Sequence, residues 1–322
     1  MLSATPTLTA VMAEFGTSPP RRLREFLRGG SFVPSDFTSI PASGSLKLKD
    51  FAGKGYWNWP WTTNPSTDNS GSVGTSSINS ARWGNNGQYL FSITDDDPCV
   101  IRRQTASTAY TPSTLGSAAT ASLTEVTTGY GFVIDTAGTV LRVFNSADST
   151  IKRYAFGTAW DVSTLSYVGS GNVSANVSEG YDMCFGAGSE NHLMFLDTGG
   201  VIVLATSVAG DFYGDFSSFD ASAVIGTSFN PSDRIFDISA PYNQLIGSSS
   251  NLTIVPRGNT LEFFTRTSST SVSSFGGLTH RHSKSVATGA VAKGFDVHPG
   301  GRYFFGMDLV GSTLYRFPLI GN

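Results

Sequence analysis

Short apolar segments alternate with glycine-containing turns through most of the chain after residue 80. The clearest example has apolar runs at residues 131–135, 139–144 and 151–156, with a Thr-Ala-Gly turn between the first two runs. Runs of this length, bounded by Gly, Ser and Asp, are typical of β-strands. A Ser/Gly-rich segment at 169–174 follows and is expected to form an outer strand. The pattern therefore predicts a unit of consecutive antiparallel strands.

Weaker copies of this unit recur along the chain. The first strands lie near positions 82, 132, 184, 236 and 296, which gives spacings of 50, 52, 52 and 60 residues. In the fourth copy, the second strand is expected at 243–246 and the third at 261–265. A period near 50 residues is in the range of β-propeller repeats, whereas solenoids of shorter repeats have periods of about 20–30 residues. The sequence therefore predicts an all-β protein, a β-propeller of five blades with four-stranded antiparallel sheets.

Residues 69–74 resemble the outer-strand segments of the repeats but precede the first copy. The last copy, in contrast, has no such segment after its third strand. We therefore expect residues 69–74 to complete the last blade and close the ring, which would leave no long open sheet edge there. Deletion of residues 67–74 is expected to lower the stability sharply.

The first 54 residues differ in composition from the repeats and contain the clearest helical signal. Ser18 and two prolines precede a short amphipathic segment that ends at Gly29 and Gly30, and Leu23, Phe26 and Leu27 share one face. The helix would have about two turns, too few to be stable without packing against a partner. The arginines of this segment are interpreted as a solvated or docking face.

A tryptophan-rich stretch separates this segment from the repeats. Trp57, Trp59 and Trp61 lie within five residues of each other and are interpreted as a domain junction, with stacking on sugar rings as the alternative. The expected organisation is an N-terminal docking segment at 1–54, a junction at 55–66 and the propeller at 67–322.

The composition narrows the possible functions. Charged residues are 14% of the chain and the net charge is −3, so no extended basic surface for nucleic acid is expected. Neither a signal peptide nor an apolar run of membrane-spanning length is seen. Cys99 and Cys184 are far apart and are expected to be reduced and buried, which suits folding in a reducing cytoplasm.

Few residue clusters suggest catalysis or metal binding. The acidic run at 95–97 is interpreted as a solvated turn rather than a cation site, and His280 with His282 as a polar strand edge rather than a metal site. No nucleophile elbow, phosphate-binding loop or zinc-protease motif is present in the sequence. We therefore expect no cofactor, no metal and no catalytic residues.

One enzymatic alternative stays open, a glycan-hydrolysing propeller. Such an enzyme would use carboxylates around the central channel, and Asp135, Asp182, Asp237 and Asp296 all lie on or beside predicted inner strands. Their simpler interpretation is hydrogen bonding in turns and in the channel.

Two motifs resemble those of tailed-bacteriophage virion structural proteins. In the first 53 residues, a Phe-Gly turn and a short helix precede Arg28-Gly29-Gly30-Ser31-Phe32-Val33-Pro34, and a segment from Ile40 to Phe51 of the form I-P-x-S-G-x-L-x-L-x-x-F follows. In the repeats, residues 154–164, with the sequence YAFGTAWDVST, are similar to a propeller repeat of phage and marine-microbe proteins, except at Phe156 and Gly157.

The resemblance implies a non-enzymatic virion component of the tail fibre, baseplate or receptor-binding kind. The N-terminal segment would attach to other tail or baseplate proteins, and the propeller would face outward, where a host glycan or protein receptor is the expected target. Capsid decoration is an alternative with the same architecture. The protein would fold in the host cytoplasm, become exposed on the virion, and occur as a homo-oligomer or in multiple symmetric copies. Neither nucleic acid binding nor membrane insertion is expected. The docking residues would be Leu23, Phe26, Leu27, Arg28, Val33, Pro34, Ile40, Pro41, Leu46, Leu48 and Phe51.

Overall fold

A computed structural model describes the part of the chain that carries the repeats. The described residues are 67–74, 78–94, 96–174, 177, 180–185, 192–197, 201–207, 216–224, 236–238, 251–257, 260–266, 278–285, 293–297, 303–307 and 313–318. The proposed docking segment, the helix within it and the tryptophan-rich junction lie outside these residues.

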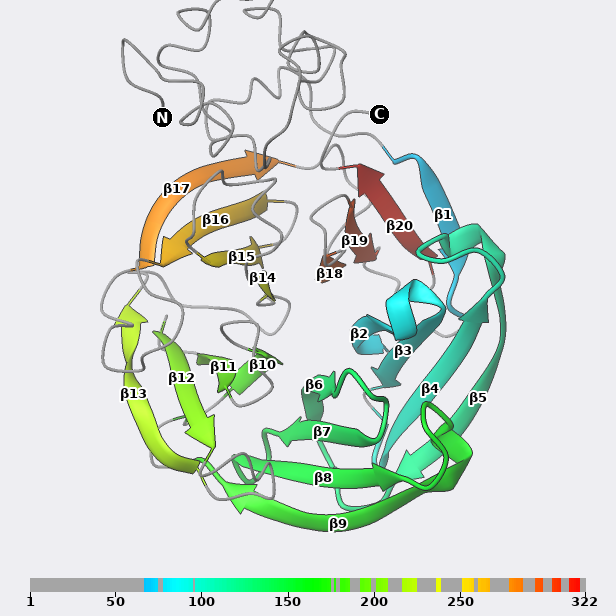
Figure 1. Ribbon diagram of the computed structural model, residues 1–322, viewed down its shortest axis with the longest axis horizontal. Helices are drawn as coiled ribbons and strands as arrows, with labels where there is room; N and C mark the ends of the chain where they lie inside the picture. The colour runs from blue at the N-terminus through cyan, green and yellow to red at the C-terminus, as the bar shows by residue number, and fades with distance from the viewer. Residues whose placement is uncertain are drawn as a thin grey trace, which may run out of the picture.

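The described chain forms an all-β, β-propeller-like structure of five four-stranded antiparallel sheets (Figure 1). The first sheet contains β2 (Ile78–Gly84), β3 (Tyr89–Thr94), β4 (Cys99–Ala106) and β5 (Leu115–Leu123). The second contains β6 (Gly129–Ile134), β7 (Val140–Asn145), β8 (Thr150–Phe156) and β9 (Leu165–Asn172). The third contains β10 (Gly180–Phe185), β11 (His192–Asp197), β12 (Val201–Ser207) and β13 (Phe216–Val224). The fourth contains β14 (Phe236–Ile238), β15 (Asn251–Arg257), β16 (Thr260–Arg266) and β17 (Leu278–Ser285).

The fifth sheet combines strands from both ends of the described chain. It contains β18 (Lys293–Val297), β19 (Tyr303–Met307) and β20 (Thr313–Pro318), and β1 (Asn69–Ser72) pairs antiparallel with β20. In this register, Asn69 lies opposite Arg316 and Ser72 lies opposite Thr313. The segment expected to act as an outer strand therefore occupies that position.

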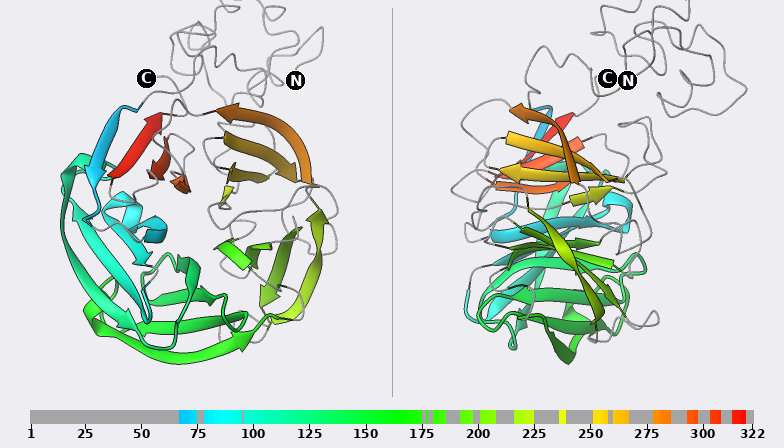
Figure 2. Two further views of the ribbon diagram at one scale, coloured as in Figure 1. Left: turned by 180° about the vertical axis from the view of Figure 1, so that it is seen from behind. Right: turned by 90° about the vertical axis from the view of Figure 1, so that its left-hand side faces the viewer.

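The sheets are arranged around a common centre (Figures 1 and 2). Strands β2, β6, β10, β14 and β18 lie innermost, and β5, β9, β13 and β17 lie on the outside. Neighbouring sheets touch near the centre, where β18 contacts β2, β2 contacts β6, β6 contacts β10, β10 contacts β14, and β15 contacts β18. Each of the five predicted first strands falls in one of these innermost strands.

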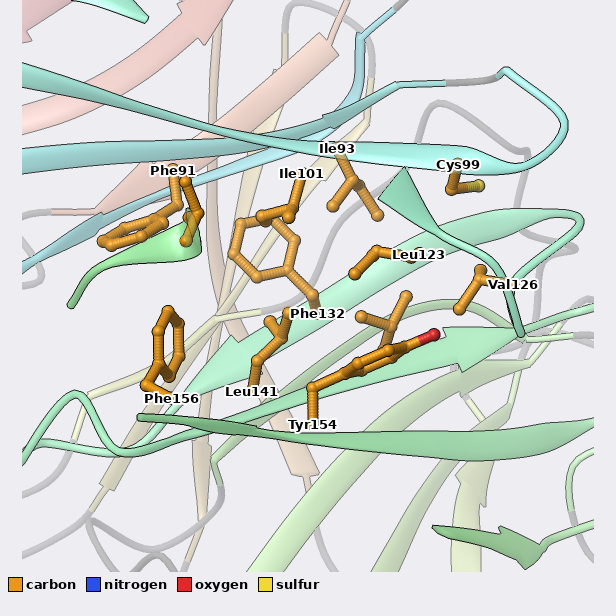
Figure 3. Close-up of a cluster of buried hydrophobic side chains, with 12 residues drawn as sticks. Phe91, Ile93, Cys99, Ile101, Leu123, Val126, Phe132, Leu141, Tyr154 and Phe156 are labelled. Atoms are coloured by element: carbon orange, nitrogen blue, oxygen red, sulfur yellow. The ribbon is translucent and has the colours of Figure 1, made fainter. Parts of the chain in front are cut away.

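The core lies between neighbouring sheets rather than within a single one. The largest described cluster, drawn in Figure 3, joins the first two sheets. Phe91 and Ile101 on the first sheet pack there with Phe132 and Leu141 on the second, and all four are fully buried. Similar clusters fill the space between the second and third sheets and between the fifth and first. Because one sheet buries both of its faces, strands such as β3 and β7 are almost wholly buried.

The second strand of the fourth sheet was predicted at the wrong place. The apolar segment at 243–246, which lies outside the described residues, was expected to form this strand, but β15 (Asn251–Arg257) does so. Residues 251–254 alternate polar and apolar side chains, and only Gly258 and Asn259 separate β15 from β16, which is a hairpin signal. Pro256 and Arg257 made this run look less like a strand than it is.

Candidate functional site

Four of the five inner strands contain a backbone irregularity, and in three of them it brings one residue to a matching position. Register shifts occur between Ile78 and Ser80 in β2, between Gly180 and Asp182 in β10, and between Gly294 and Asp296 in β18. A longer shift spans Gly129 to Phe132 in β6. Ser80, Asp182 and Asp296 thus occupy equivalent places near the centre, and bulges of this kind re-aim side chains.

Arg82 on β2 contacts the inner strands of two other sheets, β10 and β18. The Arg82 guanidinium donates a hydrogen bond of 2.7 Å to Asp182 Oδ2 and one of 3.1 Å to the carbonyl of Met183. It also lies 4.0 Å from Asp296 Oδ1, while the backbone N–H of Trp83 donates to Asp296 Oδ2 at 2.6 Å. We call Arg82, Asp182 and Asp296 the central cluster; it connects the first, third and fifth sheets.

Gly131 makes room for the carboxylate of Asp182. A Cβ atom at residue 131 would lie 2.6 Å from Asp182 Oδ1 and 2.6 Å from the backbone N of Met183. Asp182 is completely buried, and the side chain of Arg82 is only 11% exposed. The pair therefore lies in a low-dielectric environment, where ion pairing is strong but the cost of leaving one charge unpaired is high.

The central cluster brings together two of the four aspartates considered for glycan hydrolysis. Asp182 and Asp296 meet Arg82, whereas Asp135 accepts hydrogen bonds from the backbone N–H groups of Thr139 and Val140 in a turn. Asp237 lies in β14, and its side chain is outside the described residues. An arginine or backbone amides thus bind the carboxylates of Asp182, Asp296 and Asp135.

Two loops between the third and fourth strands of their sheets have nearly the same structure. They cover residues 107–114 and 157–164, and each ends in one turn of 3₁₀-helix, η5 (Pro112–Thr114) or η6 (Val162–Thr164). Tyr110 and Trp160 occupy equivalent positions, with φ of 56° and 66°. Their N–H groups donate to the carbonyls of Gly87 and Gly138, at 2.9 Å and 2.8 Å.

The aromatic ring of each loop lies over a glycine and contacts the preceding sheet. A Cβ atom on Gly138 would lie 2.1 Å from the Trp160 ring, and one on Gly87 would lie 2.3 Å from the Tyr110 ring. The ring of Trp160 is 6.0 Å from that of Phe91 on the first sheet. Trp160 thus packs between the first and second sheets. We call such a contact region between two neighbouring sheets a seam.

An equivalent arginine on the third strand reinforces each seam. Arg103 on β4 donates to the carbonyl of Trp160 at 2.8 Å, and its guanidinium lies 5.2 Å from the Tyr89 ring centroid. Arg316 on β20 likewise donates to the carbonyl of Tyr110 at 3.0 Å. Its guanidinium lies 4.4 Å from the centroid of the Tyr303 ring, a cation–π distance.

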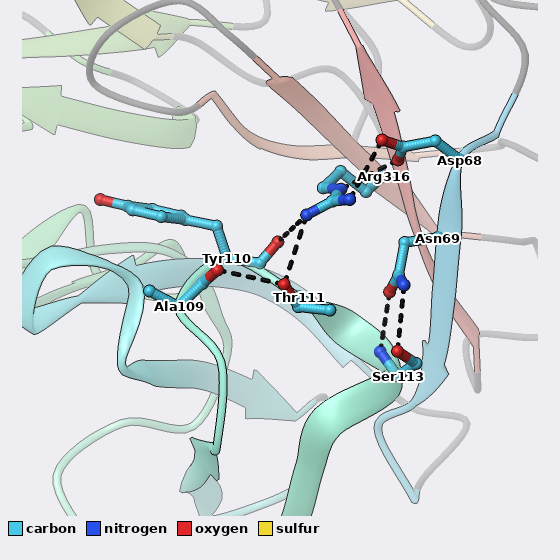
Figure 4. Close-up of polar contacts among 7 residues, drawn as sticks. All are labelled: Asp68, Asn69, Ala109, Tyr110, Thr111, Ser113 and Arg316. Carbon is cyan, nitrogen blue, oxygen red and sulfur yellow. Dashed lines mark hydrogen bonds and ion pairs between the residues drawn. The ribbon is translucent and has the colours of Figure 1, made fainter. Parts of the chain in front are cut away.

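The seam between the fifth and first sheets includes β1 (Figure 4). Asp68 and Arg316 form a bidentate ion pair with distances of 2.9 and 3.0 Å. Asn69 and Ser113 exchange two hydrogen bonds, in which the Asn69 amide donates to Ser113 Oγ at 3.0 Å and accepts from its N–H at 2.8 Å. A Cβ atom on Gly71 would collide with the carbonyl of Pro112. Strand β1 is thus held by β20 and by the loop of the neighbouring sheet.

Two ionisable groups in these regions have shifted pKa values. Two hydrogen bonds from Ser163, one from its hydroxyl and one from its N–H, hold the pKa of the Asp161 carboxyl below its usual range. Burial between the first two sheets raises the pKa of Tyr154 to about 12. Both shifts accompany structural contacts of the loops and of the core.

Two residue clusters were considered as metal sites from the sequence, the acidic run at 95–97 and the histidines of β17. Asp96 and Asp97 are exposed, and Asp95 lies outside the described residues. His280 and His282 lie on β17 opposite consecutive residues of β16, because the register shifts between them. Within the described residues, no three His, Cys, Asp or Glu side chains come together in a group suited to a metal ion.

The predicted docking and junction residues cannot be placed in relation to the central cluster. All of them lie outside the described residues: Leu23, Phe26, Leu27, Arg28, Val33, Pro34, Ile40, Pro41, Leu46, Leu48, Phe51, Trp57, Trp59 and Trp61. Their roles stay predictions. Arg82 and Gly131 were not singled out from the sequence. Gly-Tyr-Gly at 129–131 corresponds to Gly-Tyr-Asp at 180–182, and this comparison would have shown that the second repeat has glycine where the third has an aspartate.

Comparisons with known proteins identify no family. No family model matches the chain, and no curated protein matches it. Among solved structures, it is similar to a Bacteroides fragilis protein whose name provisionally assigns it as a 6-phosphogluconolactonase, with 12% identity and a TM-score of 0.38. The match covers 65% of this chain and 55% of that chain, so it spans about half of the other protein. Within the described residues, no helix is long and apolar enough to cross a membrane.

Proposed function

We propose that this chain is a non-enzymatic structural component of a phage virion, placed in the tail fibre or baseplate and displaying a β-propeller outward. Its N-terminal segment would attach to other virion proteins, and the propeller would bind a host surface glycan or protein. The motifs at residues 28–34 and 154–164 support the virion assignment through their resemblance to phage proteins. Capsid decoration is the alternative position on the same particle.

The proposal that the protein is not an enzyme rests on the ion pair between Asp182 and Arg82 in the central cluster. A hydrolase needs carboxylates that can exchange protons with a substrate. Asp182 is instead fully buried and holds an arginine from another sheet, and Asp296 accepts a hydrogen bond from a backbone N–H. The charged groups at the centre and at the seams thus hold sheets together.

We propose further that the five sheets are the blades of a closed five-bladed propeller, with β1 as the outer strand of the last blade. The pairing of β1 with β20 and the contacts of Asp68 and Asn69 support this closure. Deleting residues 67–74 would remove that strand and its ion pair. We expect a cooperative unfolding transition at a much lower temperature than in the full chain, and an unchanged midpoint would contradict the proposal.

The virion assignment is tested on the particles themselves. Antibodies against the full chain are used to label purified phage particles from the same source, and electron microscopy shows whether label appears at the tail, at the head or nowhere. In a second arm, a chain lacking residues 1–54 competes with the full chain for incorporation. We expect label at the tail and no incorporation of the shortened chain. Label at the head favours capsid decoration, and no label on any particle refutes the proposal.

The absence of catalysis is tested with capsular polysaccharides of the host. The full chain is incubated with each polysaccharide, and reducing ends and viscosity are measured over time, with an Asp237→Asn variant as the comparison. We expect binding without depolymerisation. Depolymerisation that the Asp237→Asn variant lacks would overturn the non-enzymatic assignment.

A further inference from the structure

The outer edge of the second sheet combines an uncharged strand with exposed apolar side chains. Strand β9 (Leu165–Asn172) is the last strand of its sheet and, among the described strands, hydrogen-bonds to β8 alone. An edge strand presents N–H and C=O groups that another strand can pair with. Proteins commonly protect such edges with charged residues, proline or β-bulges. Strand β9 contains no charged residue and no proline, and its register shift lies at Val168, before residues 169–172.

The fourth sheet shows what a protected edge looks like in the same chain. Its outer strand, β17 (Leu278–Ser285), contains Arg281 and Lys284 together with two histidines. Strand β13 of the third sheet contains Asp220. Strands β13 and β17 thus carry charged residues, whereas β1, β5 and β9 contain none.

Exposed apolar side chains lie on this same edge strand. Within the described residues, the large hydrophobic side chains that are exposed are Tyr167, at 42%, and Val168, at 46%. The register of β9 against β8 shifts at Val168, so this residue lies at a bulge. Beyond it, Gly169 has open space where a side chain would be, and Ser170 is exposed. The strand therefore offers a short, uncrowded backbone segment beside two exposed apolar groups.

We propose that the β9 edge is an interface with a second copy of this chain, formed by antiparallel pairing of the two β9 strands. Two identical edges related by a two-fold axis place like residues near one another, so any charge in the strand would oppose itself. The four residues 169–172 are Gly, Ser, Gly and Asn, and no such repulsion arises. Tyr167 and Val168 of both copies would be buried beside the new pair of strands. The inference stands on the edge itself and does not depend on the virion assignment.

Strand β5 (Leu115–Leu123) supplies a matched comparison. It is also an uncharged outer strand, and Thr120 lies opposite Arg102 as Ser170 lies opposite Lys152. Its exposed residues are Gly, Ser and Thr, without a large apolar side chain. Glutamate at either position would face a basic residue on the neighbouring strand, so both substitutions should leave the sheet intact.

Sedimentation velocity of the full chain over a wide concentration range tests the proposal. We expect a reversible dimer that Ser170→Glu weakens by at least about tenfold in dissociation constant, while Thr120→Glu leaves it unchanged. Tyr167→Ser should weaken the dimer as well, and circular dichroism checks that each variant is folded. A chain that stays monomeric, a dimer indifferent to Ser170→Glu, or one equally sensitive to Thr120→Glu would overturn the proposal. Particle labelling is a separate measurement, so failure of this interface leaves the virion assignment unaffected.

Discussion

Replacing Arg82 with methionine should destabilise the protein far more than replacing Lys152, whose side chain is about as buried but whose ion-pair partner is more exposed. The Arg82–Asp182 and Lys152–Asp148 pairs both have N–O distances of 2.7 Å. Asp182 is fully buried, however, whereas Asp148 is 44% exposed. Removing the partner of a buried charge costs about 3–5 kcal/mol, while an exposed pair contributes about 0.2–1 kcal/mol. The loss from Arg82→Met would thus be a large share of a typical stability of about 5–15 kcal/mol.

The measurement is urea unfolding of the full chain, followed by tryptophan fluorescence, with Lys152→Met as the control. The double variant Arg82→Met/Asp182→Asn removes both charges and should recover much of the loss, because no buried carboxylate then lacks its arginine. The reasoning would be refuted if Arg82→Met lost no more stability than Lys152→Met. It would also fail if the double variant lost the full sum of the two single changes.

Three further predictions concern the seams and the core. Gly138→Ala should lower the free energy of unfolding by about 2–4 kcal/mol, because the φ of +70° disfavours a side chain and the new Cβ would collide with the Trp160 ring. A thermal melt measures this loss, and an unchanged midpoint would argue against the packing of Trp160 on Gly138. Asp68→Asn should lower the free energy of unfolding in urea by about 1 kcal/mol. Arg316→Met should lower it further, because Arg316 also donates to the Tyr110 carbonyl of the neighbouring sheet, and equal losses would count against that second contact. The folded-state pKa of Tyr154, about 12, exceeds the unfolded value near 10, so the unfolded chain releases this proton first and stability should fall as pH rises above about 10. Tyr154→Phe should show a smaller difference in melting temperature between pH 8 and pH 11 than the parent chain, and an identical difference would contradict the assignment.

The periodic part of the fold was predictable because each sheet repeats one order of strands and turns. The innermost strands recur at a spacing of about 50 residues, which places all five correctly. The outer strands are rich in Ser and Gly, so β1 could be recognised by composition before its partner was known. The fourth sheet was harder, since Pro256 and Arg257 interrupt the apolar signal of β15.

The central cluster was only half predictable. Asp182 and Asp296 could be singled out because they recur at one position of the repeat. Their partner Arg82 could not, because 100 residues separate it from Asp182 and the contact forms only when the sheets surround a common centre. A buried pair of this kind depends on three-dimensional proximity, which a single sequence does not encode in any local pattern.

The way β1 is fastened also determines how the protein would respond to mechanical force. Strand β1 is the first described strand, and in the sequence it follows the junction and the predicted N-terminal segment. Tension applied through that segment would reach Asp68 and Asn69 before any other strand of the described structure. Asp68 passes load to the fifth sheet through Arg316, and Asn69 passes it to the first sheet through Ser113. Two sheets would therefore share a pull that would otherwise peel one short strand from its neighbour.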